Sequence, residues 1–90
     1  MNPNPSCPEE VELHTNAWVC GMRAATYFGP VKLEREGGDM ETMMCEAIDD
    51  MQLKAFHLGA NAVVGVELMA DPFERSVRII GTAAHLEPLY

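Results

Sequence analysis

The stretch LGANAVVGVELMADP, residues 58–72, decides the fold. Its Leu58 ends an amphipathic run that begins at Met40, and Gly59 readily takes the left-handed conformation found at helix ends. Asn61 suits the turn that follows, and a run of small and β-branched residues then favours an extended chain. The stretch therefore predicts a junction between a long helix and a buried strand.

The helix is predicted over Met40–Leu58, with Asp39 as a favourable N-cap. Residues on the other sides of this helix include Cys45, Leu53 and Phe56, which are either scattered exposed residues or contacts with a neighbouring copy of the chain. One face carries apolar residues at the helical period, and we expect this face to pack on a sheet. Its members are Met40, Met44, Ala47, Ile48, Met51, Ala55 and Leu58.

Two strands are predicted after the helix, over Ala62–Met69 and Val77–Leu86, and the short turn between them predicts antiparallel pairing. In the first strand, Gly65 lies on the face away from the helix and leaves room for a neighbouring backbone or subunit. The face expected to contact the helix consists of Ala62, Val64, Val66 and Leu68. In the second strand, the alternating set is Val77, Ile79, Gly81, Ala83 and His85.

The sequence before the helix predicts two further strands. Residues 17–26 alternate with Gly21 in the middle, residues 11–15 form a shorter strand, and residues 29–38 form either an edge strand or an ordered loop. Residues 1–10 contain three of the six prolines and predict a flexible arm, and residues 11–90 form a single domain. The predicted order is β-β-α-β-β, an α+β fold with two layers in which one long helix packs on a small antiparallel sheet.

The run LGANAVVGVEL after a long helix, followed by a strand that contains GTA (residues 81–83), resembles the YbjQ-like family. Members of that family are labelled "putative heavy-metal-binding" domains. The residues that carry the motif include Gly59, Asn61, Gly65 and Gly81. The resemblance implies a dodecin-like subunit with two layers and a ring-shaped homopentamer, and it implies no fixed set of metal ligands.

Composition limits the classes of partner. The chain has 90 residues, of which 48% are apolar, and this high fraction predicts self-association into a homo-oligomer. The net charge of −8 disfavours binding to nucleic acid or to an anionic membrane surface. The beginning of the sequence lacks the features of a signal peptide, and three widely spaced cysteines are typical of a reduced compartment. We therefore expect a cytoplasmic protein.

A divalent or heavy-metal ion is the cofactor that the sequence leaves open. The candidate ligands are Cys20, Cys45 and His85, none of which belongs to a closely spaced pair of the kind that marks zinc sites. Cys20 and Cys45 meet only if the first strand passes near the helix or if two subunits contribute them. The alternatives are small buried cysteines and a hydrogen-bonded His85. We expect His14, near a turn, to be solvated.

Catalysis is not expected. Asp49 and Asp50 are neighbours on a helix and so point apart, and Ser6 and Ser76 lie in loops rather than in a nucleophile elbow. Two classes of function remain. One is an oligomeric module that binds a metal ion or a small ligand between subunits, and the other is a structural or partner-interaction module without ligand chemistry.

Overall fold

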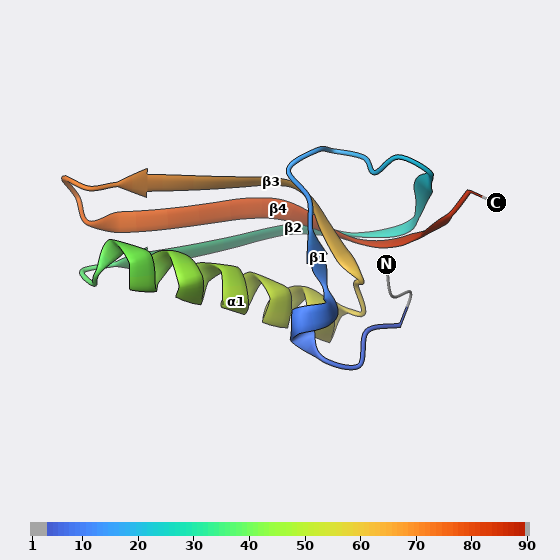
Figure 1. Ribbon diagram of the computed structural model, residues 1–90, viewed down its shortest axis with the longest axis horizontal. Helices are drawn as coiled ribbons and strands as arrows, with labels where there is room; N and C mark the ends of the chain where they lie inside the picture. Colours follow the sequence, from blue (N-terminus) through green and yellow to red (C-terminus); the bar gives the residue numbers. More distant parts are fainter. Residues whose placement is uncertain (1–3, 90) are drawn as a thin grey trace.

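A long helix lies along one face of a four-stranded sheet in the computed structural model, which describes residues 4–89 (Figure 1). Residues 1–3 of the predicted arm lie outside the described residues. The two-layer α+β fold confirms the predicted class, and the order of the four strands around the helix is the predicted one. In chain order the elements are η1 (Pro8–Glu10), β1 (Glu12–Leu13), β2 (Met22–Glu36), α1 (Met40–Leu58), β3 (Ala62–Asp71) and β4 (Ser76–Pro88).

The sheet is mixed, with the strand order β1-β3-β4-β2. β4 pairs antiparallel with both of its neighbours, whereas β1 pairs parallel with β3, so that Glu12 lies beside Ala62. The prediction of an antiparallel sheet is therefore wrong at this edge. The long connection from β1 through β2 and α1 permits the parallel arrangement, which two strands joined by a tight turn cannot adopt.

The bounds of α1 are the predicted ones because its end signals are local. The Asp39 carboxylate accepts a hydrogen bond from the Thr42 amide at 3.1 Å, and Gly59 ends the helix with φ +92°. The buried face is shifted from the predicted stripe, because Met43 is buried and Leu58 is 47% exposed. The fully buried helix residues are Met43, Ala47, Met51 and Ala55.

A bulge in β3 changes which side chains face the helix. Val63 packs in the core against α1, while Ala62 and Val64 belong to a cluster on the opposite face of the sheet. The register with β4 then shifts beyond Val64, where Gly65 has φ +63°, and Val66 packs against the helix-side core. The predicted orientation is wrong for Ala62 and Val64 and right for Val66, because the bulge interrupts the alternation.

β2 begins later and ends later than predicted. It starts at Met22 rather than at Ala17, and it continues through the uncertain region 29–38 as far as Glu36. Gly21 therefore precedes the strand, with φ +78°, instead of lying in its middle. β2 contains Pro30 and two irregularities in its register with β4, features that an edge strand tolerates.

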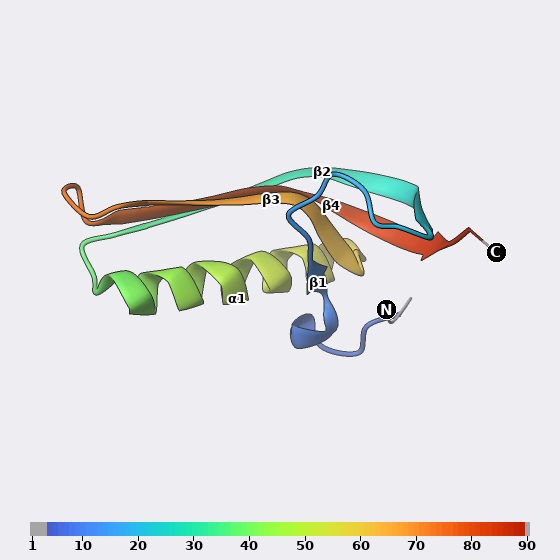
Figure 2. The same cartoon turned by 45° about the horizontal axis from the view of Figure 1, so that its top comes forward.

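The two faces of the sheet are covered by different elements (Figure 2). α1 covers one face, and its core combines helix residues with Val31, Leu33, Val77 and Ile79. The loop at residues 14–21 crosses the other face, where Val19 packs over a second cluster. That cluster consists of Ala62, Val64, Ala84 and Leu86. Toward the β3–β4 hairpin the second face carries exposed residues, Glu34, Met69 and Arg78, in one row across the strands.

The side of α1 away from the sheet contacts the N-terminal segment of the same chain. The Gln52 amide donates to the Val11 carbonyl at 2.9 Å, and Phe56 is partly buried beside Pro5. This packing of η1 and its flanks on the helix was not predicted. No helix among residues 4–89 is long and apolar enough to cross a membrane.

Candidate metal site

The three predicted metal ligands are not brought together within one chain. Cys20 is exposed on the loop that covers one face of the sheet, whereas Cys45 is exposed on α1, which lies on the other face (Figure 2). His85 lies in β4 opposite Thr26 of β2 and is partly buried. Among residues 4–89, no group of three or more His, Cys, Asp or Glu side chains is placed to hold a metal ion. A role for these residues between subunits stays a prediction.

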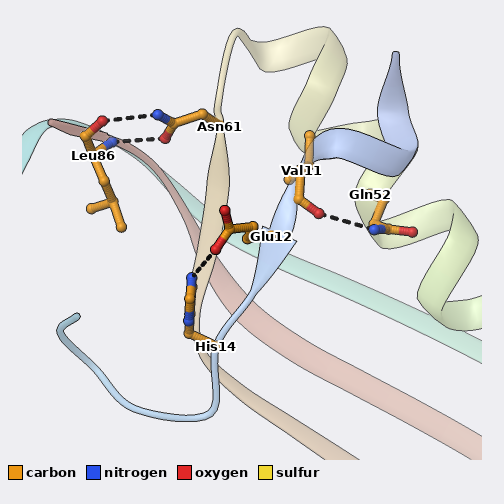
Figure 3. A network of polar contacts seen from close by, with 6 residues as sticks. All are labelled: Val11, Glu12, His14, Gln52, Asn61 and Leu86. Carbon is orange, nitrogen blue, oxygen red and sulfur yellow. Dashed lines mark hydrogen bonds and ion pairs between the residues drawn. The ribbon is translucent and has the colours of Figure 1, made fainter. Parts of the chain in front are cut away.

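Asn61 joins the strands beside a second candidate site, which contains Glu12 and His14 (Figure 3). Its side chain is fully buried and forms two hydrogen bonds with Leu86, donating to the carbonyl and accepting from the amide, both at 2.8 Å. Its own amide donates to the Ala84 carbonyl, and its carbonyl accepts from the Glu12 amide. Asn61 therefore joins β1, β3 and β4, which goes beyond the turn position that the sequence indicated.

The same junction fixes Glu12 and His14 side by side. The His14 amide donates to the Val63 carbonyl at 2.9 Å, and the His14 carbonyl accepts from the Val66 amide at 3.0 Å. In an extended segment, residues two apart point to the same side. Accordingly, His14 Nε2 lies 3.2 Å from Glu12 Oε1 (Figure 3).

The contact between these two side chains has a feature that suits a metal ion. His14 Nε2 is buried and makes no hydrogen bond within residues 4–89, although the Glu12 carboxylate oxygen lies 3.2 Å away as a potential ion-pair partner. Two donor atoms that share a tetrahedral zinc ion lie about 3.4 Å apart, given bonds of about 2.0–2.2 Å. The separation of 3.2 Å therefore fits two ligands of one ion as well as a simple ion pair. The prediction that His14 is solvated is wrong at this nitrogen.

A thiol faces the same region. His14 and Cys20 both line an open pocket of about 370 Å³, and Trp18 forms part of its wall. A carboxylate oxygen, an imidazole nitrogen and a thiolate sulfur are the donor types that zinc and softer metals accept. The residues present therefore fit a metal ion in chemistry, although Cys20 must approach the other two donors to complete a set of three.

The remaining cysteine is less suited to metal binding. A hydrogen bond to the Glu9 carboxylate, followed by burial and the charge of Glu10, raises the pKa of the Cys7 thiol. A raised pKa disfavours the thiolate, which is the form that binds metals. Cys7 also does not line the pocket that His14 and Cys20 share, so it is left out of the candidate site.

The fold and the composition define a class, a small acidic α+β domain with one helix packed on a four-stranded mixed sheet. Residues 33–87 match the YbjQ family, whose description is "putative heavy-metal-binding". Because this match covers more than half of the sequence, the chain belongs to that family, which confirms the resemblance. A comparison with curated proteins gives no match. Cys45 and His85 lie within the matched range, whereas Glu12, His14 and Cys20 precede it.

The Glu12–His14 pair was not predicted from the sequence. The available signal was the spacing Glu-x-His in an expected strand, which places both side chains on one face. Nothing local indicates that the imidazole nitrogen becomes buried, because the burial depends on β1 lying parallel to β3.

Proposed function

We propose that the protein is a homo-oligomeric module that binds a zinc-like or softer metal ion. His14 Nε2 and Glu12 Oε1 are the first two ligands and Cys20 Sγ is the third. The observation that carries the proposal is the buried imidazole nitrogen, which lies 3.2 Å from a carboxylate oxygen and makes no hydrogen bond in the described part of the chain. The family description supports metal binding by the chain, and it concerns residues 33–87.

Each ligand would have a defined role. The bound ion would supply a positive charge that the carboxylate and the thiolate neutralise, and the imidazole would bind in its neutral form. Two of these ligands are held in place by backbone hydrogen bonds, from the Glu12 amide to the Asn61 carbonyl and from the His14 amide to the Val63 carbonyl. A fourth position is left for water or for a donor from a neighbouring subunit.

Self-association is the second part of the proposal, with a ring-shaped homopentamer as the expected assembly. It is supported by large apolar side chains that a single chain leaves exposed, among them Trp18, Tyr27, Leu53, Leu58 and Phe73. Such surface is commonly covered in an interface. Of the predicted interface residues, Cys45 and Leu53 are exposed, while Phe56 and Gly65 are partly covered by the same chain. We propose no enzymatic activity and no binding to nucleic acid or membranes.

The test of metal binding is calorimetric titration of the purified protein with Zn²⁺. We expect one ion per chain, and we expect His14→Gln to lower the affinity at least tenfold because it removes a ligand while keeping a polar side chain. The matched control is His57→Gln, which changes an exposed histidine on α1 and should leave the affinity unchanged. Absence of Zn²⁺ uptake, or equal affinities for the two variants, would contradict the proposal.

A titration with Cd²⁺ tests the thiol separately, because a cadmium–thiolate bond has its own ultraviolet charge-transfer absorbance. We expect the absorbance to disappear in Cys20→Ser and to persist in Cys45→Ser. The opposite result would assign the thiol ligand to α1 and remove Cys20 from the site.

A structural module without ligand chemistry is the second candidate function. The exposed apolar residues favour it, because they support assembly whether or not a metal is present. Native mass spectrometry of protein purified from cells distinguishes the two functions. Bound metal mass on an oligomer supports the first, and a bare oligomer that does not take up added Zn²⁺ supports the second.

A further inference from the structure

The bulge in β3 lies beside the candidate metal site. The register with β4 shifts between Val64 and Glu67, so that two residues of β3 oppose the single residue Gly81. The first of these two residues is Gly65, whose φ is +63°. Glycine adopts this left-handed conformation without steric cost, whereas a β-branched residue rarely adopts it. The bulge therefore depends on the glycine at position 65.

The bulge turns two consecutive amides toward the N-terminal segment. In a regular strand successive amides point to opposite sides, so only alternate amides bond to the same neighbouring strand. Here the Gly65 amide donates to the Asn16 carbonyl at 2.8 Å, and the next amide, that of Val66, donates to the His14 carbonyl at 3.0 Å. The bulge thus binds the N-terminal segment at two points that a regular strand would not offer together.

These two bonds complete the hold on His14, the first proposed ligand. The His14 amide also donates to the Val63 carbonyl at 2.9 Å, so the residue is held through both its amide and its carbonyl. β1 ends at Leu13, and the bonds from the bulge continue the alignment with β3 as far as Asn16. At this position the buried His14 Nε2 lies 3.2 Å from Glu12 Oε1.

The requirement at position 65 concerns backbone conformation and not space. In the described part of the chain, a Cβ atom at Gly65 would have no heavy atom within 4 Å apart from its chain neighbours. Gly37 offers a matched comparison, because it has φ +84° and equally open surroundings. It lies in the turn between β2 and α1, at the hairpin end of the molecule and away from β1 (Figure 1).

We propose that Gly65 is a positioning residue for the metal site, which acts by setting the His14 imidazole against the Glu12 carboxylate. The inference rests on the proposed metal binding and deepens it. Groups that hold a metal ligand in its orientation raise the affinity, because the ligand loses less freedom when the ion binds. The backbone partners of both ligands in β3 lie within the family match at residues 33–87, whereas the ligands precede it. The matched range therefore contributes the support of the site and not its first two ligands.

The first test compares Zn²⁺ affinities by calorimetry. Gly65→Val favours an extended backbone and should lower the affinity about 10- to 100-fold, the range found when the support of a metal ligand is removed. Gly37→Val imposes the same strain away from the site and should leave the affinity unchanged. Gly65→Asn adds a side chain but tolerates positive φ, so it should restore most of the affinity lost in Gly65→Val. Equal losses in the two Val variants, or no recovery in Gly65→Asn, would overturn the inference.

The second test asks whether Gly65 acts through His14. In a double-mutant cycle, the His14→Gln variant already lacks the ligand that the bulge positions. Adding Gly65→Val to it should therefore lower the Zn²⁺ affinity by less than a further factor of about two. A full additional loss would mean that the bulge supports some other part of the site, and the proposed role would be wrong.

The third test needs no metal. Hydrogen exchange at the His14 and Val66 amides, measured by nuclear magnetic resonance, should be about tenfold faster in Gly65→Val, in line with the loss of a hydrogen bond. It should be unchanged in Gly37→Val. Unchanged exchange in Gly65→Val would contradict the proposed role of the bulge.

Two further points keep the outcomes distinct. Circular dichroism establishes whether each variant folds, and if Gly65→Val does not, Gly65→Ala replaces it with Gly37→Ala as its control. Equal Zn²⁺ affinities of the unchanged protein and the folded Gly65 variant overturn this inference alone. Absence of Zn²⁺ uptake by the unchanged protein overturns the proposed function as well.

Discussion

The two faces of the sheet differ in how much core they form and in what covers them. The face toward α1 forms one continuous core that includes Met51, Val63 and Ile79. The other face has a small cluster beneath the loop at residues 14–21 and is exposed toward the hairpin. A chain of this length can form only one extensive core. The helix face therefore provides most of the stability, and the other side of the sheet carries the loop that lines the candidate metal site.

The largest loss of stability is expected from a substitution at Met51, on the side of α1 that faces the sheet. Met51 is fully buried against the sheet, so Met51→Ala should lower the free energy of unfolding by about 2–5 kcal/mol in urea denaturation. Leu53→Ala is the matched control, since Leu53 is 42% exposed on the same helix and should lower the free energy of unfolding by less than about 1 kcal/mol. Equal effects would mean that the outer side of α1 is buried in an assembly.

The second prediction concerns the junction beneath the loop. In Asn61→Asp the new carboxylate cannot donate to the Leu86 carbonyl, and it places an acid in a buried position. We expect the free energy of unfolding to fall by about 1–3 kcal/mol, with faster hydrogen exchange at the Leu86 amide. Asn16→Asp, in the exposed part of the loop, is the control. If both variants unfold alike, the Asn61 side chain does not hold β4.

The third and smallest prediction compares two glycines. A Cβ atom at Gly81 would lie 2.6 Å from a methyl group of Val63, whereas Gly65 has open space but a positive φ. Each substitution by Ala should lower the free energy of unfolding by about 1 kcal/mol, for these different reasons. Adding Val63→Ala should relieve the defect of Gly81→Ala and not that of Gly65→Ala. A double-mutant cycle measures this coupling.

The parts of the fold that follow local signals were predictable from the sequence. Asp39 and Gly59 determine the bounds of α1 through hydrogen bonds and backbone conformation within one turn. The alternation along β4 was also predicted, and Val77, Ile79 and Ala83 of the alternating set share the helix-side core.

The parts that depend on distant residues were not predictable. Ala62 and Val64 were expected to face the helix, but they lie on the opposite face because β3 has a bulge at Gly65. No sequence pattern within β3 predicts this bulge. β1 pairs in parallel with a strand that follows the helix, so its partner lies outside any sequence window. The candidate metal site was unpredictable for the same reason, because the His14 backbone bonds to Val63 and Val66 of β3 and His14 Nε2 is buried there.

The contact between Gln52 and Val11 joins residues 41 positions apart in the sequence, and the pairing of β1 with β3 spans a similar separation. Contacts between distant residues form slowly, because a long loop must close before they contribute. On the ribosome, residues 11–14 must wait until the helix and the start of β3 have been synthesised. The N-terminal segment therefore docks late in folding, and Glu12 and His14 come together only in a nearly complete chain.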